Sequence, residues 1–371
     1  MHSSLGLSKL RLIFLLIASL AVGGLAGLMA VALCALVMRF GGTEAPDKHG
    51  ISVQQSVRVG GVLIAIYLAL YIGYQYFLLN ASTVTSGVLF CTVASISFFM
   101  LGLQEDLKGN LSAVVRFILM LALAGAIVWL RPDYRLVSLG VPLLDELLLG
   151  SYMATVVFAV LGLVFLANAF NTADGANGLA SGVGVFCALG LALVLPADMQ
   201  LFMRSVAVSC LLFLIYNLTS GRFFLGDGGA YLLGAAIGLC AIQSSNTAAA
   251  STWFLLSLLF YPVADLTWSV IRRIAVGRSP LTADNGHLHN YVFDYVSQLG
   301  FTPKRANTST GLGLAILFSA IPLALFYFSR LSDDELNWLA IYASMWVVYL
   351  LMWVLLSTWR TIKLRPKRLE T

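Results

Sequence analysis

Four amide and carboxylate side chains recur at intervals of three residues where a long apolar stretch ends. Residues 151–167 read SYMATVVFAVLGLVFLA, and residues 168–180 continue as NAFNTADGANGLA. Residues three apart are neighbours on a helix surface, so Asn168, Asn171, Asp174 and Asn177 are expected to share one face. Their oxygens are suited to a hard cation or a polar ligand. The segment predicts a polar site where an apolar helix meets water.

More carboxylates stand at the ends of other apolar stretches. Glu105 and Asp106 are adjacent, and Asp227 lies between glycines in FLGDGGAYLLG. Neighbouring carboxylates repel each other unless a cation compensates, and Mg²⁺ needs only one or two of them when a substrate supplies phosphates. The start of the helix after Asp227 would offer free N–H groups to phosphate. The alternative interpretation of these acids is ordinary helix caps, and of GDGG a tight turn.

Two of the four histidines fall together in DNGHLHN. His287 and His289 are two residues apart, which is not the spacing of a helical zinc pair, and no cysteine is nearby. With Arg278 and Lys48 close in the fold, they would suit a diphosphate. A solvated loop is the alternative.

The elements that must position these residues are membrane helices. The chain has 371 residues, of which 60% are hydrophobic and 11% charged, and its mean hydropathy is +0.90. A soluble domain is typically about a quarter charged, so we exclude that class. A spanning helix needs roughly 20 apolar residues. Eleven stretches qualify, at 12–38, 59–79, 83–104, 112–131, 151–170, 179–196, 199–217, 229–245, 251–271, 309–329 and 337–359. The first is too long for a signal peptide and reads as a retained helix.

The basic residues indicate the orientation. The net charge is +5, but the bases are dispersed at the ends of the stretches, which argues against nucleic-acid binding. With eleven spans, sixteen Lys and Arg fall on one side and five on the other, with Arg204 near the second side. The positive-inside rule makes the first side cytoplasmic and the N-terminus external. The polar segments then face the cytoplasm.

The residues therefore predict an all-α, polytopic integral membrane bundle of about 10–11 transmembrane helices with a cytoplasm-facing active-site cleft. One transmembrane domain spans 1–371 and ends in a basic cytoplasmic tail at 360–371. Carboxylates, a divalent metal and basic groups at a membrane surface suit phosphoryl transfer from a soluble nucleotide to a lipid acceptor. The rival class is a transporter with acids lining a path, but transporter acids lie nearer the bilayer midplane.

The order of motifs over about 45–291 resembles the polyprenyl-phosphate N-acetylhexosamine-1-phosphate transferases. That family includes bacterial enzymes that start O-antigen and teichoic acid synthesis, and the phospho-MurNAc-pentapeptide transferase. The motifs that carry the resemblance are PDKH…RVGG, GLQEDL, NAFNTADGANGLA, Asn217 ten residues before Asp227 of GDGG, PVADLTWSVIRR and DNGHLHN.

The resemblance implies transfer of an N-acetylhexosamine-1-phosphate from a UDP-sugar to undecaprenyl phosphate with release of UMP, as the first membrane step of a cell-surface polysaccharide. It implies that Asp227 and Asn171 hold Mg²⁺, or Mn²⁺ in its place, and that Glu105 or Asp106 orients or deprotonates the lipid phosphate. Asn177 would lie near the uracil, and His287 and His289 would meet the diphosphate or sugar. The other substrate-binding residues implied are Lys48, His49, Asn168, Asp174, Asn217 and Arg278.

Three departures from the family pattern bear on these roles. Glu105 replaces the first Asp of a pair, Asn177 replaces an Asp common in the peptidoglycan branch, and Asn290 replaces a second adjacent histidine. The loop lacks a triple-His run, which argues against the phospho-MurNAc-pentapeptide alternative. The expected partners are UDP-N-acetylhexosamine, undecaprenyl phosphate and the bilayer of the inner (plasma) membrane. A homodimer, the identity of the sugar and the pathway stay open.

Overall fold

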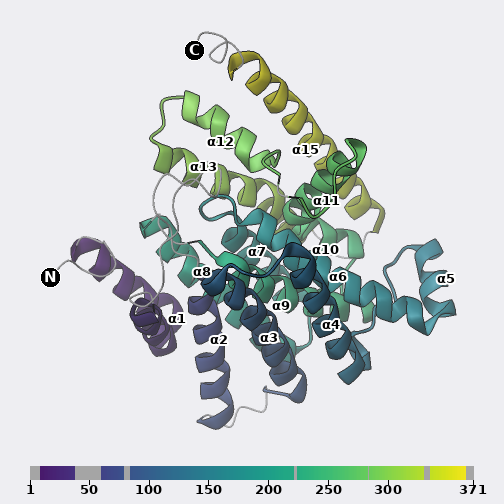
Figure 1. The fold of residues 1–371 in the computed structure, drawn as a ribbon. Helices are drawn as coiled ribbons and strands as arrows, with labels where there is room; N and C mark the ends of the chain where they lie inside the picture. Colours follow the sequence, from purple (N-terminus) through teal and green to yellow (C-terminus); the bar gives the residue numbers. More distant parts are fainter. Residues whose placement is uncertain are drawn as a thin grey trace.

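The structure is a computed structural model that describes residues 9–37, 60–78, 84–220, 224–282, 284–329 and 335–364. Over these ranges the chain is helical and has no strand (Figure 1). The helices are α1 Lys9–Val37, α2 Gly60–Phe77, α3 Ser86–Lys108, α4 Ala113–Leu130, the 3₁₀ helix η2 Pro132–Tyr134, α5 Pro142–Gly150, α6 Tyr152–Ala173, α7 Leu179–Val194, α8 Ala197–Ser220, α9 Gly226–Asn246, α10 Thr252–Leu258, α11 Phe260–Ala275, α12 Leu288–Gln298, α13 Pro303–Ala315, the π-helical segment η3 Ile316–Ala320, α14 Ile321–Phe328 and α15 Glu335–Leu364. The predicted all-α, polytopic membrane bundle is confirmed.

Every predicted span coincides with a helix, but two do not form a simple crossing. Among the described residues, nine helices are long and apolar enough to cross a membrane. The stretch 251–271 instead forms α10 and α11, bent by 81° at Leu259, and 179–196 gives only the 16-residue α7. The bend precedes Pro262, which has no backbone N–H to donate to the preceding turn and is tolerated in the first turn of a new helix.

Helix α9 lies at the centre of the bundle, and almost all of its side chains are buried. Its small residues let other helices approach its backbone. A Cβ on Gly234 would lie 2.4 Å from the Ala167 Cα of α6, and a Cβ on Gly102 of α3 would lie 2.4 Å from the Asp227 carbonyl carbon. Close contact between small residues is a common way for membrane helices to pack. The start of α9 is thereby held between α3 and α6.

The acids of α3 are positioned by the end of that helix. Gly109 adopts a left-handed conformation with φ 59°, and its N–H donates to the Glu105 carbonyl at 2.7 Å, which ends the helix. Ser112 then caps α4 by accepting from the Val115 N–H. This tight connection places Glu105 and Asp106 in the last turn of α3, beside the first turn of α4.

The remaining elements lie at the periphery. The segment 131–150 contains η2 and α5, and α5 projects at the right of Figure 1. Helices α12 and α13 lie at the top of that view, near the end of α15. Cys34, Cys91, Cys187, Cys210 and Cys240 are all buried and free, as apolar side chains in helices would be.

Candidate active site

The Asp227 carboxylate joins three helices at the start of α9. Its Oδ1 accepts from the Asn171 amide of α6 at 2.7 Å. Its Oδ2 accepts from the Arg116 guanidinium of α4 in a short contact, and from the Tyr231 hydroxyl at 3.3 Å. The residue is only 6% exposed. The three donors satisfy both oxygens of this buried carboxylate.

Two further carboxylates cap α9. Asp106 accepts from the backbone N–H groups of Asp227 at 2.9 Å and Gly228 at 2.8 Å. Asp174 accepts from the Gly226 N–H at 2.9 Å. The sequence prediction that these N–H groups are free for phosphate is therefore wrong, because protein carboxylates occupy them. The alternative interpretation of acids as helix caps holds for Asp106 and Asp174.

Glu105 approaches the same Arg116 nitrogen, Nη1, as Asp227 does. Its Oε1 is 3.9 Å from the Arg116 Nη1, and its Oε2 accepts from the Leu111 N–H at 3.0 Å. The Arg116 guanidinium thus contacts a carboxylate of α3 and a carboxylate of α9, two helices far apart in sequence. Because Asp106 and Asp174 also meet the start of α9, the structure gathers four acids around residues 226–228.

The polar residues of 168–177 do not all share the expected face. Asn171 and Asp174 reach the start of α9, but the Asn168 amide donates to the Val164 carbonyl of its own helix at 2.8 Å. Because α6 ends at Ala173, Asn177 lies beyond the helix, where its N–H donates to the Asn307 side chain of α13 at 2.6 Å. The other predicted amide, Asn217, is buried near the end of α8.

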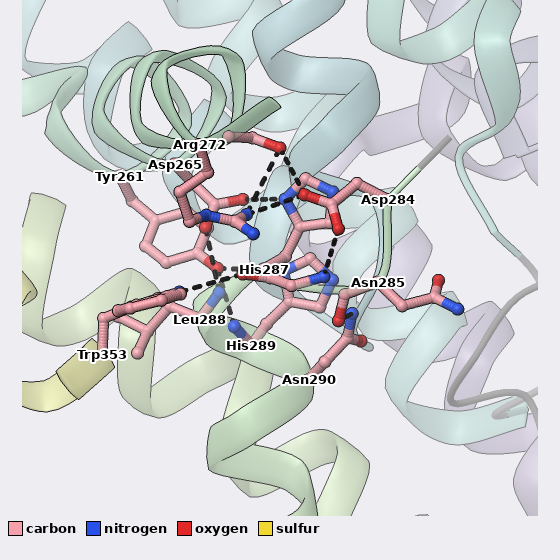
Figure 2. Close-up of polar contacts among 12 residues, drawn as sticks. Tyr261, Asp265, Arg272, Asp284, Asn285, His287, Leu288, His289, Asn290 and Trp353 are labelled. Atoms are coloured by element: carbon pink, nitrogen blue, oxygen red, sulfur yellow. Dashed lines mark hydrogen bonds and ion pairs between the residues drawn. The ribbon is translucent and has the colours of Figure 1, made fainter. Parts of the chain in front are cut away.

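The two predicted histidines form a second cluster with residues of α11 (Figure 2). His287 Nδ1 is 2.8 Å from Asp265 Oδ2, and His289 Nδ1 is 3.0 Å from the Tyr261 hydroxyl. The two imidazoles stack with an interplanar angle of 1°. Burial lowers the pKa of His289 to about 4, so this ring is neutral at pH 7, although Asp265 opposes the effect of burial. The solvated-loop alternative is not what the structure shows.

The histidine cluster abuts the acid cluster. A Cβ on Gly175 would lie 2.1 Å from the His289 Nε2, so the backbone just after Asp174 packs directly against this ring. Asp174 caps α9, and the next residue, Gly175, packs against His289. The turn after α6 therefore links the histidine cluster to the start of α9. This contact accounts for a glycine at position 175, because no side chain would fit there.

The predicted basic residues near the histidines are placed differently. Arg278 is exposed in the turn after α11, and the described part of the chain shows no bond from it to either histidine. Arg272 lies closer, and its Nη2 is 2.8 Å from Asp284 Oδ2. Burial would raise the pKa of Asp284, but the Gly286 N–H and the neighbouring Ser269 and Arg272 lower it overall. Lys48 and His49 lie outside the described residues.

Several site residues were missed as such from the sequence, chiefly Arg116 and Asp265. Both were visible as charges inside apolar stretches, which are costly and therefore functional candidates. The tyrosines that hold the two clusters carried no comparable signal, because Tyr231, Tyr261 and Tyr349 look like ordinary apolar-helix residues until their hydroxyl partners are known.

The donor set can be compared with the needs of a magnesium ion. Within the described residues, no three His, Cys, Asp or Glu side chains are grouped as metal ligands. Asp227 still offers carboxylate oxygens, and Asn171, which donates through its amide nitrogen, keeps its amide oxygen. Mg²⁺ commonly takes one or two carboxylates and completes its shell with waters and substrate phosphates. The two residues fit such an ion, provided that Arg116 yields Asp227 to it.

Comparison with known sequences finds a family that the part of the chain carrying this site resembles. A sequence model described as glycosyl transferase family 4 matches residues 88–245, which include the four acids and all of α9 except its last residue. Over these residues the chain is similar to glycosyl transferase family 4. The named relatives that the chain resembles are transferases. This supports the prediction of an enzyme over the alternative of a transporter.

Three relatives illustrate the resemblance to family 4. The decaprenyl-phosphate N-acetylglucosaminephosphotransferase of Mycolicibacterium smegmatis is 26% identical over 73% of this chain and 72% of the relative. The probable undecaprenyl-phosphate N-acetylglucosaminyl 1-phosphate transferase of Bacillus subtilis is 28% identical over 69% of this chain and 70% of the relative. The undecaprenyl-phosphate alpha-N-acetylglucosaminyl 1-phosphate transferase of Thermotoga maritima is 30% identical over 53% and 58%.

Proposed function

We propose that the protein transfers an N-acetylhexosamine-1-phosphate from a UDP-sugar to a polyprenyl phosphate and releases UMP. Transfer of a hexosamine-1-phosphate to a polyprenyl phosphate follows from the family and its named relatives. The single observation that carries the proposal is the meeting of Glu105, Arg116 and Asp227 beside the capped start of α9. Phosphoryl transfer needs mainly positioning and charge neutralisation, and this arrangement offers both.

The geometry distinguishes the two adjacent acids. Both oxygens of Asp106 accept backbone N–H bonds from α9, so this carboxylate serves to hold Asp227 in place. Glu105 has one oxygen on the Leu111 N–H, and among the described residues its other oxygen is near the Arg116 guanidinium only. We therefore assign to Glu105 the role of meeting the lipid phosphate, and to Arg116 the role of neutralising that phosphate's charge.

A divalent cation is part of the proposal. Asp227 and Asn171 would hold Mg²⁺, which would supply positive charge near the donor diphosphate as negative charge moves to the leaving UMP. Asn171 would orient Asp227 through the amide bond at 2.7 Å. His287 and His289 would face the diphosphate or sugar from the loop against Gly175.

The test is an assay of the purified, full-length protein in detergent. It is incubated with undecaprenyl phosphate and a panel of UDP-N-acetylhexosamines, and UMP release is followed. We expect release with at least one donor, dependence on the lipid phosphate, and loss of activity on chelation that Mg²⁺ restores. UMP release without lipid phosphate, or none from any donor with Mg²⁺ present, would contradict the proposal.

The orientation in the membrane is also a proposal. Nine crossing helices, the bent α10–α11 pair and α7 together give the eleven segments that put the N-terminus outside and the C-terminus inside. The site then lies on the cytoplasmic side of the inner membrane, and the UDP-sugar would reach it from the cytoplasm. A reporter fused after Thr371 should be active only in its cytoplasmic form. Activity of a periplasm-only reporter at the same position would reverse the assignment.

A further inference from the structure

The last described helix, α15, carries none of the sequence motifs. It nevertheless contacts the histidine loop, residues 284–290, and the helices on either side of that loop, α11 and α12. The Tyr349 hydroxyl donates to Asp265 at 2.8 Å, the Trp353 indole donates to the Gly286 carbonyl at 2.9 Å, and the Arg360 guanidinium is 2.9 Å from Asp294 of α12. Positions 349, 353 and 360 lie on one face, because eleven residues make about three helical turns. Only 11% of the residues in the most apolar part of α15 are buried. The face that makes these contacts therefore differs from the rest of the helix, which is largely exposed.

Asp265 is the point on which these contacts converge. Its Oδ1 accepts from the Tyr349 hydroxyl and from the Leu288 N–H at 3.0 Å, and its Oδ2 is 2.8 Å from His287 Nδ1. The residue is 1% exposed. An ionised carboxylate only accepts hydrogen bonds, so the proton between Asp265 and His287 belongs on Nδ1. Figure 2 shows the His287 ring held in this way beside His289.

The other nitrogen of the His287 ring is left for a ligand. Nε2 has no protein hydrogen-bond partner among the described residues. It is also not fully buried, because it is absent from the set of buried polar atoms without a partner. With Nδ1 fixed by Asp265, Nε2 is an acceptor when the ring is neutral and a donor when it is protonated. A charge-assisted bond from Nε2 to a phosphoryl oxygen would be strengthened by the carboxylate behind the ring.

We propose that Tyr349 and Asp265 are positioning residues that keep a proton on Nδ1 of His287 and fix the orientation of the ring, so that Nε2, on gaining a proton, donates to a phosphoryl oxygen of the sugar-nucleotide donor. The identity of the ligand rests on the proposed function, whereas the positioning of the ring does not. Tyr349 acts through Asp265 and touches no reacting atom. Its ring is already packed against Phe260, Phe318 and Trp346, so only its hydroxyl is assigned this role.

The test compares two identical changes on the same helix. Tyr349→Phe removes the hydroxyl that bonds Asp265, whereas Tyr342→Phe removes a hydroxyl two turns earlier that has no bond to this carboxylate, and both rings stay in aromatic contacts. We expect Tyr349→Phe to lower kcat/KM for the donor roughly tenfold, the order expected for a lost hydrogen bond to a buried charge. We expect Tyr342→Phe to stay within about twofold of wild type.

A spectroscopic readout separates positioning from packing. The chain has only four histidines, so ¹⁵N-labelled histidine gives few ring signals, and loss of one signal in His287→Gln assigns that ring. We expect wild-type His287 to show the Nδ1–H tautomer near neutral pH, Tyr349→Phe to show a mixture, and Tyr342→Phe to match wild type. Thermal melting of all three proteins in detergent checks that they are folded.

Three results would overturn the proposal. They are an Nε2–H tautomer in wild type, unchanged His287 signals in Tyr349→Phe, and equal losses of kcat/KM in the two phenylalanine variants. If wild type releases no UMP from any donor while Tyr349→Phe still alters the His287 signals, the proposed reaction fails and the positioning role stands.

Discussion

Asp227→Asn is expected to lower kcat on the order of a hundredfold or more, which corresponds to a few kcal/mol of barrier. The substitution keeps the shape of the side chain and removes its charge. Asp227 is the carboxylate on which α4, α6 and α9 converge, and a magnesium site with few protein ligands cannot lose its one charged ligand. The measurement is UMP release at saturating donor and lipid phosphate.

The matched control is Asp133→Asn. The Asp133 side chain is 78% exposed and pairs with Arg131 outside the site, so the same chemical change should leave turnover near wild type.

A companion variant, Asn171→Ala, removes the amide that orients Asp227, and it should raise the Mg²⁺ concentration needed for half-maximal rate. Near-normal turnover of folded Asp227→Asn across a range of Mg²⁺ concentrations would place the metal and the chemistry elsewhere.

The positions of the membrane helices could be predicted from the sequence because hydropathy alone decides them. Every predicted stretch is helical over most of its length, since the backbone has no other way to satisfy its polar groups in lipid. The bend at Leu259 could not be derived in the same way. The bend is accompanied by the contact between Asp265 of α11 and His287, which is a tertiary contact that composition does not reveal.

The acids of the candidate site were found because carboxylates are rare in apolar sequence, but their individual bonds were not predictable. Asp106 and Asp227 are 121 residues apart, and only the packing of α3 on α9 shows that one caps the other. Arg116 was visible as an isolated charge, yet nothing in its local sequence connects it with Asp227. Pairing across distant helices is information that a single sequence does not contain.

The histidine loop shows the same division. DNGHLHN indicated two histidines facing polar ligands, and spacing argued against zinc, but the partners of the rings come from α11 and α15. Tyr349 lies 62 residues after His287, in a helix whose sequence signals only a membrane span. A tyrosine that donates one buried hydrogen bond looks the same in sequence as one that packs against lipid.

Gly102→Ala is expected to destabilise the protein by about 1–3 kcal/mol and to reduce turnover sharply, because it adds a methyl group where two backbones touch. The new Cβ would lie 2.4 Å from the Asp227 carbonyl carbon and 2.4 Å from the Gly228 nitrogen. Neither atom belongs to a side chain that could rotate away, so α3 and α9 must separate. Asp106 lies one turn after Gly102 on the same face, and it would then lose its bonds to the two N–H groups of α9.

The control for this change is Gly162→Ala in α6, where an added Cβ meets nothing within 4 Å. Alanine at an unstrained helical position is neutral or slightly stabilising, so this variant should melt and turn over like wild type. Thermal melting in detergent measures stability, and UMP release measures turnover. The two effects of Gly102→Ala should appear together, because the same movement that strains the helix contact displaces Asp227. If Gly102→Ala behaves like Gly162→Ala in both measurements, α3 and α9 are further apart than the structure places them, and Asp106 cannot be the cap that holds Asp227 in position.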